Sequence, residues 1–301
     1  QKLNTNLIDI NYIFTAHTNA SYLPNYIKKE NVKIKVVRFP EATILSPNNK
    51  ENPFLKIENK KIYNVLSDFF LFSSKSDMEV FFGKKIKKEV KKKIIFCGIL
   101  RYENWWIKKY RKNNNKKNKK FLILIPLRPP NKSFFQKESF ENFLHSAKYL
   151  VDNLADAQII FKLHPDLNKE HLVSNYLKNF NKNSWKISTR HMLDLSNYAN
   201  VCIGTMTSAC LDSLANKVPT IDYYDVNYEL KKSQHLKKMI NVAYDKDQKK
   251  WLPIFTFKKI MKNVTNKNDL LKIVRDIKDK KNKSVWREYY QNFDKIICFQ
   301  K

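Results

Sequence analysis

Two stretches decide the fold: AQIIFKLHPD, residues 157–166, and NVCIGTMTSACLDSLANKVPTIDYY, residues 200–224. The first is an apolar, β-prone run that stops at His164-Pro165, where the proline prevents further ladder pairing. The second predicts a strand that breaks at Gly204, then hydroxyl side chains that suit the start of a helix, then a short helix and another strand. Helix starts at the carboxyl edge of a parallel sheet bind phosphates, so we expect a phosphate site there.

The same alternation of strand and helix extends through residues 120–260. Residues 121–125 and 159–163 read as buried strands, and residues 137–154 read as the helix between them. Strands at 32–39, 68–73 and 93–97, with a helix at 75–82, predict an earlier α/β domain. The sequence therefore predicts an α/β, GT-B-like chain: two Rossmann-like, doubly wound domains that face a cleft.

The expected domain boundaries follow from composition. Residues 1–119 form an N-terminal, acceptor-side Rossmann-like domain that ends in a Lys-rich linker, residues 120–260 a nucleotide-binding Rossmann-like domain, and residues 261–301 C-terminal closing helices. From Lys231 onward the apolar pattern is helical. The first domain is short for a complete Rossmann-like unit and starts at Gln1 rather than Met, so we expect it to be incomplete at its N-terminus.

The composition is strongly basic, with a formal net charge of +30 and a pI of about 9.8. Attraction to a polyanion explains this charge, and so does compositional bias, since Lys, Asn and Ile are abundant while only 3 Gly occur. The four cysteines are scattered without CxxC spacing, so neither a zinc site nor a disulfide framework is expected. No apolar run approaches the ~18 residues of a membrane span, and we expect a cytoplasmic protein.

The candidate site residues lie where predicted strands end. His164 ends one strand and faces the ligand crevice, although a lone histidine is usually structural. Thr205, Thr207 and Ser208 either cap the following helix or bind a phosphate, and both roles are compatible.

Two further polar residues extend this candidate site. Asp212 lies in the predicted helix, where it binds ribose hydroxyls or is a solvated carboxylate. Arg128 follows the strand at 121–125, where it meets a diphosphate or is an ordinary surface arginine.

These residues carry a resemblance to a known family. Lys162-x-His164-Pro165, then Gly204-x-x-Thr207-Ser208 and Lys-x-Pro-Thr-Ile at 217–221, resemble the nucleotide-binding half of bacterial GT-B-fold surface-polysaccharide transferases. The most similar members are CDP-glycerol glycerophosphotransferases and the capsule, Kdo and sialic-acid transferases that use CMP-sugars. The resemblance covers residues 65–225 approximately.

The resemblance implies that the His-Pro pair and the Thr-Ser pair contact the nucleotide's phosphates, with Lys162, Gly204 and the other strand-end residues around them. The family often carries a His-Gly after a strand of the first domain, with that histidine as catalytic base. This sequence has Phe39-Pro40-Glu41 in that place, so Glu41 is the candidate base, and His17 is a weaker one.

The sequence therefore predicts a metal-independent glycosyltransferase of cell-surface polysaccharide biosynthesis. Its donor is a CMP- or CDP-linked sugar, it needs no cofactor, and His164 stabilises the leaving phosphate. No Asp-x-Asp metal signature stands at a strand end. Its acceptor is a glycan or a lipid-linked glycan, which an anionic inner membrane face presents to the basic chain and Trp105-Trp106.

Three alternatives stay open: a CDP-glycerol-type glycerophosphotransferase, a UDP-sugar 2-epimerase-like enzyme, and a non-catalytic basic protein that binds nucleic acid. The last is disfavoured because no nucleic-acid-binding signature occurs. The donor sugar, the acceptor, the stereochemical outcome and the oligomeric state do not follow from the sequence.

Overall fold

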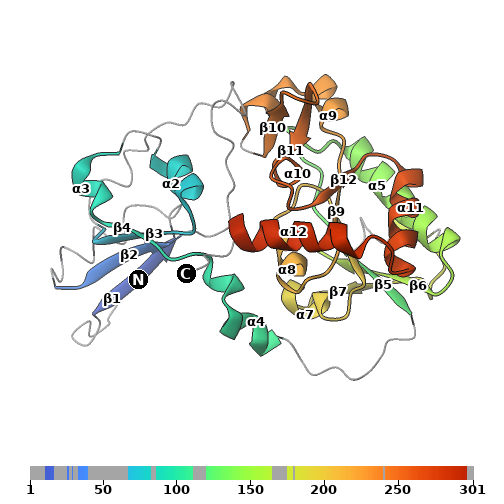
Figure 1. Ribbon diagram of the computed structural model, residues 1–301, viewed down its shortest axis with the longest axis horizontal. Helices are drawn as coiled ribbons and strands as arrows, with labels where there is room; N and C mark the ends of the chain where they lie inside the picture. Colours follow the sequence, from blue (N-terminus) through green and yellow to red (C-terminus); the bar gives the residue numbers. More distant parts are fainter. Residues whose placement is uncertain are drawn as a thin grey trace. The chain divides into compact units, whose positions relative to one another are not determined.

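The computed structural model of the chain describes residues 11–16, 26, 29, 33–39, 67–82, 86–110, 120–164, 175–178, 180–239 and 241–296. The described residues up to Leu100 belong to one compact unit and those from Arg101 to the second. Each unit is built on its own parallel sheet (Figure 1).

The first unit has a four-stranded parallel sheet in the order β1-β2-β3-β4. Aromatic rings on β3 pack edge to face on Phe82, with centroids 5.1 Å away for Phe70 and 5.6 Å for Phe72. This small core confirms the strands predicted here. Its elements are β1 (Tyr12–Ala16), β2 (Lys35–Phe39), β3 (Phe69–Phe72), α2 (Lys75–Phe82), α3 (Lys88–Lys91) and β4 (Ile94–Phe96).

Helix α2 begins as its sequence predicts. The Ser74 hydroxyl accepts the backbone N–H of Asp77 at 3.2 Å, the usual N-cap interaction. The buried Asp77 carboxylate accepts in turn from the hydroxyl of Ser73 at 2.9 Å, and burial raises its pKa to about 6.

The second unit has a six-stranded parallel sheet in the order β12-β9-β8-β5-β6-β7. Numbered within the unit, the order β7-β6-β5-β8-β9-β12 reads 3-2-1-4-5-6, that of a doubly wound dinucleotide-binding sheet. The predicted α/β class with a doubly wound sheet is confirmed here. The strands are β5 (Phe121–Pro126), β6 (Ala157–Lys162), β7 (Trp185–Ser188), β8 (Val201–Gly204), β9 (Thr220–Tyr223) and β12 (Lys262–Val264).

Both faces of this sheet are buried. Successive side chains of a strand point to opposite faces, and on β5 both sets are buried. On β5, Ile123 and Ile125 join the large core under α5, while Leu122 and Leu124 are buried on the opposite face. Helix α11 packs beside α5, whereas α7, α8 and α12 lie together, with α7 against β5 and α8 against β8 and β9 (Figure 1). These helices are α5 (Lys137–Asn153), α7 (Met192–Ser196), α8 (Cys210–Ala215), α11 (Lys267–Lys278) and α12 (Lys283–Ile296).

One sequence expectation is wrong: the region after Lys231 is not uniformly helical. Strand β10 (Val242–Asp245) pairs antiparallel with β11 (Lys250–Pro253). The Asp245 carboxylate accepts the backbone N–H groups of the next turn at 2.9 and 3.0 Å, which favours a turn over a continuing helix. Around this hairpin lie α9 (Val226–Lys232), η4 (Gln234–Lys238) and α10 (Ile254–Phe257).

The sequence also placed residues 101–119 with the first domain. In the structure, η3 (Leu100–Tyr102) leads into α4 (Asn104–Tyr110), and α4 lies beside α7 in the second unit. The closing helices α11 and α12 belong to this unit too, because Trp286 on α12 is part of the same core as α5.

Three helices end with lysine in the left-handed conformation. Lys217, Lys259 and Lys280 have φ values of 58°, 52° and 58°. In each case the next residue's N–H bonds back to the carbonyl five residues earlier, at 2.8–2.9 Å, which defines a Schellman motif. Glycine is the usual residue at this position, since a Cβ disfavours positive φ.

Candidate functional site

The second unit has one point at which its strand order reverses. The chain runs from β5 outward to β6 and β7, then returns to β8 on the other side of β5. Leu124 pairs with Cys202, so β5 and β8 both end two residues later, at Pro126 and Gly204. The loops that follow β5 and β8 leave the carboxyl edge of the sheet in opposite directions. Open α/β sheets bind their ligands in the crevice between two such loops.

The turn after β8 is tightly fixed. A Cβ at Gly204 would collide with the Sγ of Cys210 and lie 3.0 Å from Cγ2 of Thr207, so only glycine fits. Two residues later, Met206 has a φ of 45°, which is unusual for a residue with a side chain.

Hydrogen bonds hold both sides of Met206. The buried Asp222 carboxylate accepts its N–H at 2.8 Å, and the Arg128 guanidinium donates to its carbonyl at 2.5 Å. Burial raises the pKa of Asp222 to about 7, opposed by the Met206 N–H and by Arg128. Sequence reasoning missed Asp222, although a lone carboxylate inside the apolar strand TIDY was a signal.

Arg128 reaches across the switch point from the end of β5. Its guanidinium also lies 4.3 Å from the ring centroid of Phe134, a cation–π contact that fixes the plane of the fork. Burial lowers the pKa of Arg128, while Tyr224 and Asp222 favour its charge. An arginine stays cationic in proteins, so the positively charged Arg128 guanidinium lies where the sequence predicted a diphosphate.

The predicted hydroxyls lie on the same turn. Thr205 is buried, Thr207 is half-buried and Ser208 is exposed. The Thr207 hydroxyl accepts the N–H of Ala209 at 3.3 Å, whereas Ala209, the N-cap of α8, makes no side-chain cap. The Thr207 hydroxyl therefore serves the turn before the helix, and phosphate binding by these hydroxyls stays a prediction.

Lys162 and His164 stand at the end of β6, the strand next to β5. The Lys162 ammonium donates to the carbonyl of Leu163 at 2.8 Å, and burial lowers its pKa. His164 is exposed two residues later. Pro165 lies outside the residues that the structure describes, and so do the proposed bases His17 and Glu41.

Asp212 is neither solvated nor unpaired. It is fully buried in α8, where its carboxylate pairs with the Arg101 guanidinium and accepts from the Tyr102 hydroxyl at 3.1 Å. Burial raises the pKa of Asp212, opposed by Arg101. Burial alone would lower the pKa of Arg101, but Asp212 and Tyr102 raise it. The solvated alternative is thus wrong, and ribose binding by Asp212 stays a prediction.

His191 completes this cluster and was also missed by sequence reasoning. Its Nδ1 accepts the N–H of Leu193 at 3.2 Å, so it is the N-cap of α7. The ring of Tyr110 stacks on it with centroids 5.0 Å apart, and its Nε2 lies 3.4 Å from Nη2 of Arg101. Histidine is rarely an N-cap residue, and Arg101 is 90 residues away in the sequence. No local sequence pattern therefore indicates that Arg101 and His191 are neighbours.

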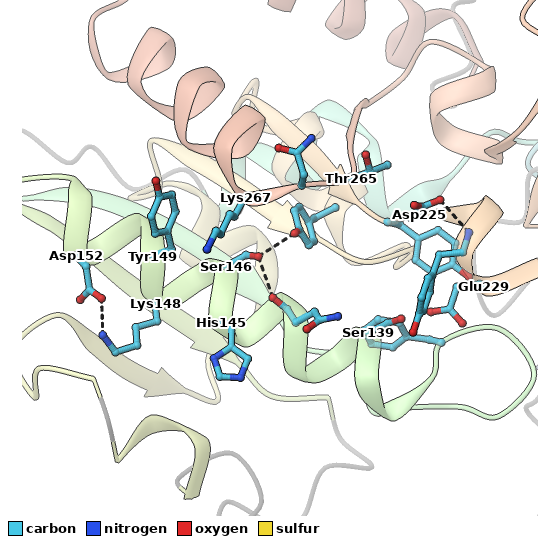
Figure 2. Close-up of a pocket in the computed structure, with 16 residues that line it drawn as sticks. Ser139, His145, Ser146, Lys148, Tyr149, Asp152, Asp225, Glu229, Thr265 and Lys267 are labelled. Atoms are coloured by element: carbon cyan, nitrogen blue, oxygen red, sulfur yellow. Dashed lines mark hydrogen bonds and ion pairs between the residues drawn. The ribbon is translucent and has the colours of Figure 1, made fainter. Parts of the chain in front are cut away.

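A separate pocket of about 650 Å³ lies between α5, the end of β9 and the start of α11 (Figure 2). None of the predicted site residues lines it. Many of its polar groups pair with one another: Ser146 with Tyr223 at 2.8 Å, and Lys148 with Asp152. This pocket is therefore not the site that the sequence predicted.

The two parallel sheets define an α/β protein with Rossmann-like units, and the solved structures that match it show that this fold is GT-B-like. A scan against protein families finds no match for this chain, and a search of curated proteins finds none. Solved structures do match. A UDP-N-acetylglucosamine 2-epimerase superposes with a TM-score of 0.58 and 11% identity, over 95% of this chain and 68% of that one.

Two further solved structures are similar. The S. aureus MnaA–UDP complex has a TM-score of 0.55 and 11% identity, over 94% of this chain and 70% of that one. A variant of the wall teichoic acid polymerase TagF has a TM-score of 0.57 and 15% identity, over 96% and 68%. At such identities the likeness establishes the fold.

Among the described residues, no helix is long and apolar enough to cross a bilayer. No group of three His, Cys, Asp or Glu side chains in the same part of the chain is arranged to hold a metal ion.

Proposed function

We propose that the protein is a glycosyltransferase of cell-surface polysaccharide biosynthesis that uses a cytidine-nucleotide-activated sugar without a metal ion. One observation carries this proposal. Arg128, Lys162, His164 and the Thr207-Ser208 hydroxyls stand at the carboxyl ends of three adjacent strands, β5, β6 and β8. Cations and hydroxyls at a switch point suit a nucleotide's phosphates.

In this mechanism the second unit stabilises the leaving nucleotide. Arg128 and Lys162 offset the charge that develops on its phosphate, and His164 donates a hydrogen bond to the departing oxygen. An acceptor hydroxyl attacks on the opposite side of the sugar and needs a base, for which Glu41 or His17 of the first unit is proposed.

Two alternatives use the same nucleotide site. The likeness to TagF, solved also after soaking with CDPG, favours a CDP-glycerol-type glycerophosphotransferase. The likeness to UDP-N-acetylglucosamine 2-epimerases and to the MnaA–UDP complex favours a UDP-sugar 2-epimerase-like enzyme. The three reactions differ in product: a glycosylated acceptor, a glycerophosphate-bearing acceptor, or an isomerised sugar without any acceptor.

A binding experiment tests the shared nucleotide site. Thermal unfolding is followed with CMP, CDP and UDP, for the wild type and for His164→Ala. We expect a cytidine nucleotide to raise the wild-type midpoint and to lose most of that effect in the variant. The control is His145→Ala, which removes an exposed histidine of α5 outside the site. Indifference to all three nucleotides, with tight polynucleotide binding, would contradict the proposal.

The acceptor side is proposed from charge and exposed aromatic surface. Trp105 on α4 is 62% exposed, and the chain carries a net charge of +30. We place the enzyme in the cytoplasm, at an anionic membrane face that presents lipid-linked acceptors. Co-flotation with vesicles of anionic lipid, reduced in Trp105→Ala, is the expected result. Equal flotation with neutral lipid would contradict this placement.

A further inference from the structure

Two hydrogen-bond donors face each other beside the predicted site. Because Nδ1 of His191 accepts the N–H of Leu193, a neutral imidazole carries its proton on Nε2. Burial lowers the pKa of His191, and the charge of Arg101 lowers it further, so the ring is neutral near pH 7. An arginine nitrogen only donates. The 3.4 Å approach of Nε2 to Nη2 of Arg101 is therefore donor against donor and is not a hydrogen bond.

The protein holds both donors in this position. The buried Asp212 carboxylate binds Arg101 and is itself held by the Tyr102 hydroxyl. The ring of Tyr110 lies nearly parallel to His191, with an interplanar angle of 22°. Helix capping fixes the other edge of the imidazole. Neither donor turns away without losing a contact, so the pair is built to share an acceptor.

A third donor lies close by. Lys162 ends β6, and it pairs in register with Ser188, three residues before His191. Its charge is near enough to lower the pKa of His191. Arg101 and His191 thus present two donors side by side with the charge of Lys162 nearby, and the Asp212 carboxylate that accompanies them is already occupied by Arg101 and Tyr102. An anionic acceptor satisfies both donors and offsets the neighbouring charge of Lys162.

We infer that Arg101 and His191 bind one anionic oxygen between them, a phosphoryl oxygen of the nucleotide, with Lys162 beside it. The nucleotide is that of the proposed function, on which this inference rests. Arg101 and His191 would then be binding residues that join η3, α7 and β6 on a single phosphate. Arg128 and the Thr207-Ser208 turn follow β5 and β8 at the same edge of the sheet.

The test is a substitution that keeps the helix cap and removes the distal donor. Asparagine is a favoured N-cap residue, so His191→Asn keeps an acceptor for Leu193 and loses the Nε2 proton. Calorimetric titration with CDP is expected to show about tenfold weaker binding, and titration with cytidine no change. His145→Asn, the same change at an exposed position of α5, is the matched control.

Inorganic pyrophosphate separates this inference from the proposed function. Nitrogen-15 spectra of the histidine side chains report whether pyrophosphate perturbs Nε2 of His191. Perturbation together with the tenfold loss supports the inference. Perturbation without binding of any nucleotide keeps the anion site and overturns the proposed function. If CDP binds equally well to His191→Asn and to the wild type, or if pyrophosphate leaves Nε2 unchanged, the inference falls and the proposed function is untouched.

Discussion

Asp222 carries a buried carboxylate beneath the turn that follows β8. Its Oδ1 accepts the Met206 N–H, and its Oδ2 has no hydrogen-bond partner among the described residues. Burial raises its pKa from 3.8 to about 7. An ionised carboxylate with one unsatisfied buried oxygen destabilises the folded state, so this residue makes the strand-end turn sensitive to pH.

Asp222→Asn is expected to change the pH dependence of stability. Between pH 4 and 7 the folded wild type holds a proton on Asp222 that the unfolded chain has lost. Its free energy of unfolding therefore falls as the pH rises, by up to about 1.4 kcal/mol per unit, and levels off above the folded pKa. The variant lacks this decline. Urea unfolding of both proteins at pH 4.5 and 7.5 measures this decline. If the free energies of unfolding of wild type and variant differ by the same amount at both pH values, the prediction is wrong.

Gly204 gives a second prediction at the residue scale. Gly204→Ala places a Cβ against the Sγ of Cys210 and is expected to destabilise by about 1–3 kcal/mol. It should also weaken nucleotide binding, since Thr207 must move. Adding Cys210→Ala removes the colliding sulfur and is expected to recover most of the lost stability, whereas the contact with Thr207 and the loss of binding remain. Strictly additive losses in the double variant, measured by chemical unfolding, would show that the collision is not the cause.

At the scale of elements, periodicity predicted the strands and helices that the core requires. The run at 121–125 became β5, and the pattern at 75–82 became α2 with the bounds predicted. The hairpin β10–β11 was missed, because two four-residue strands are too short to show a period of two. Strand β12, with three residues, was missed for the same reason.

The site was predictable only in part, and for a similar reason. Lys162 ends a strand, and Arg128 and the Thr207-Ser208 turn follow strands, so topology alone brings them to one edge of the sheet. The contact of Arg101 with His191 depends on how α4 packs on α7, which no local pattern encodes. Sequence reasoning therefore finds residues that strands position and misses those that helix packing positions.

Helix α12 is predicted to be held by its buried face and not by its exposed ion pair. Phe293 is fully buried and lies 5.5 Å from the ring of Tyr102. The Lys217–Asp294 pair, at 2.5 Å, joins side chains that are 41% and 37% exposed. We expect Phe293→Ala to lower the free energy of unfolding by about 3–5 kcal/mol and Lys217→Met by less than about 1 kcal/mol. Similar losses in the two variants would contradict this.

For the whole molecule, the net charge of +30 predicts general attraction to polyanions. Binding to a labelled single-stranded polynucleotide, followed by anisotropy, should weaken by about 10³-fold or more between 50 and 200 mM salt. Binding of CMP, which places far fewer charges in a formed site, should weaken much less. Polynucleotide binding that stays tight at 200 mM salt would favour the nucleic-acid-binding alternative.

The three helix ends that carry lysine in a Schellman motif bear on the origin of that charge. A left-handed conformation costs a residue with a Cβ about 1–2 kcal/mol, and glycine avoids this. Lys259→Gly and Lys280→Gly should therefore each raise the unfolding midpoint while removing a positive charge. Lysine therefore stands at these positions against the preference of the backbone. This favours compositional bias over attraction to a polyanion as the origin of these charges, and a less basic, more stable version of the same protein is within reach of design.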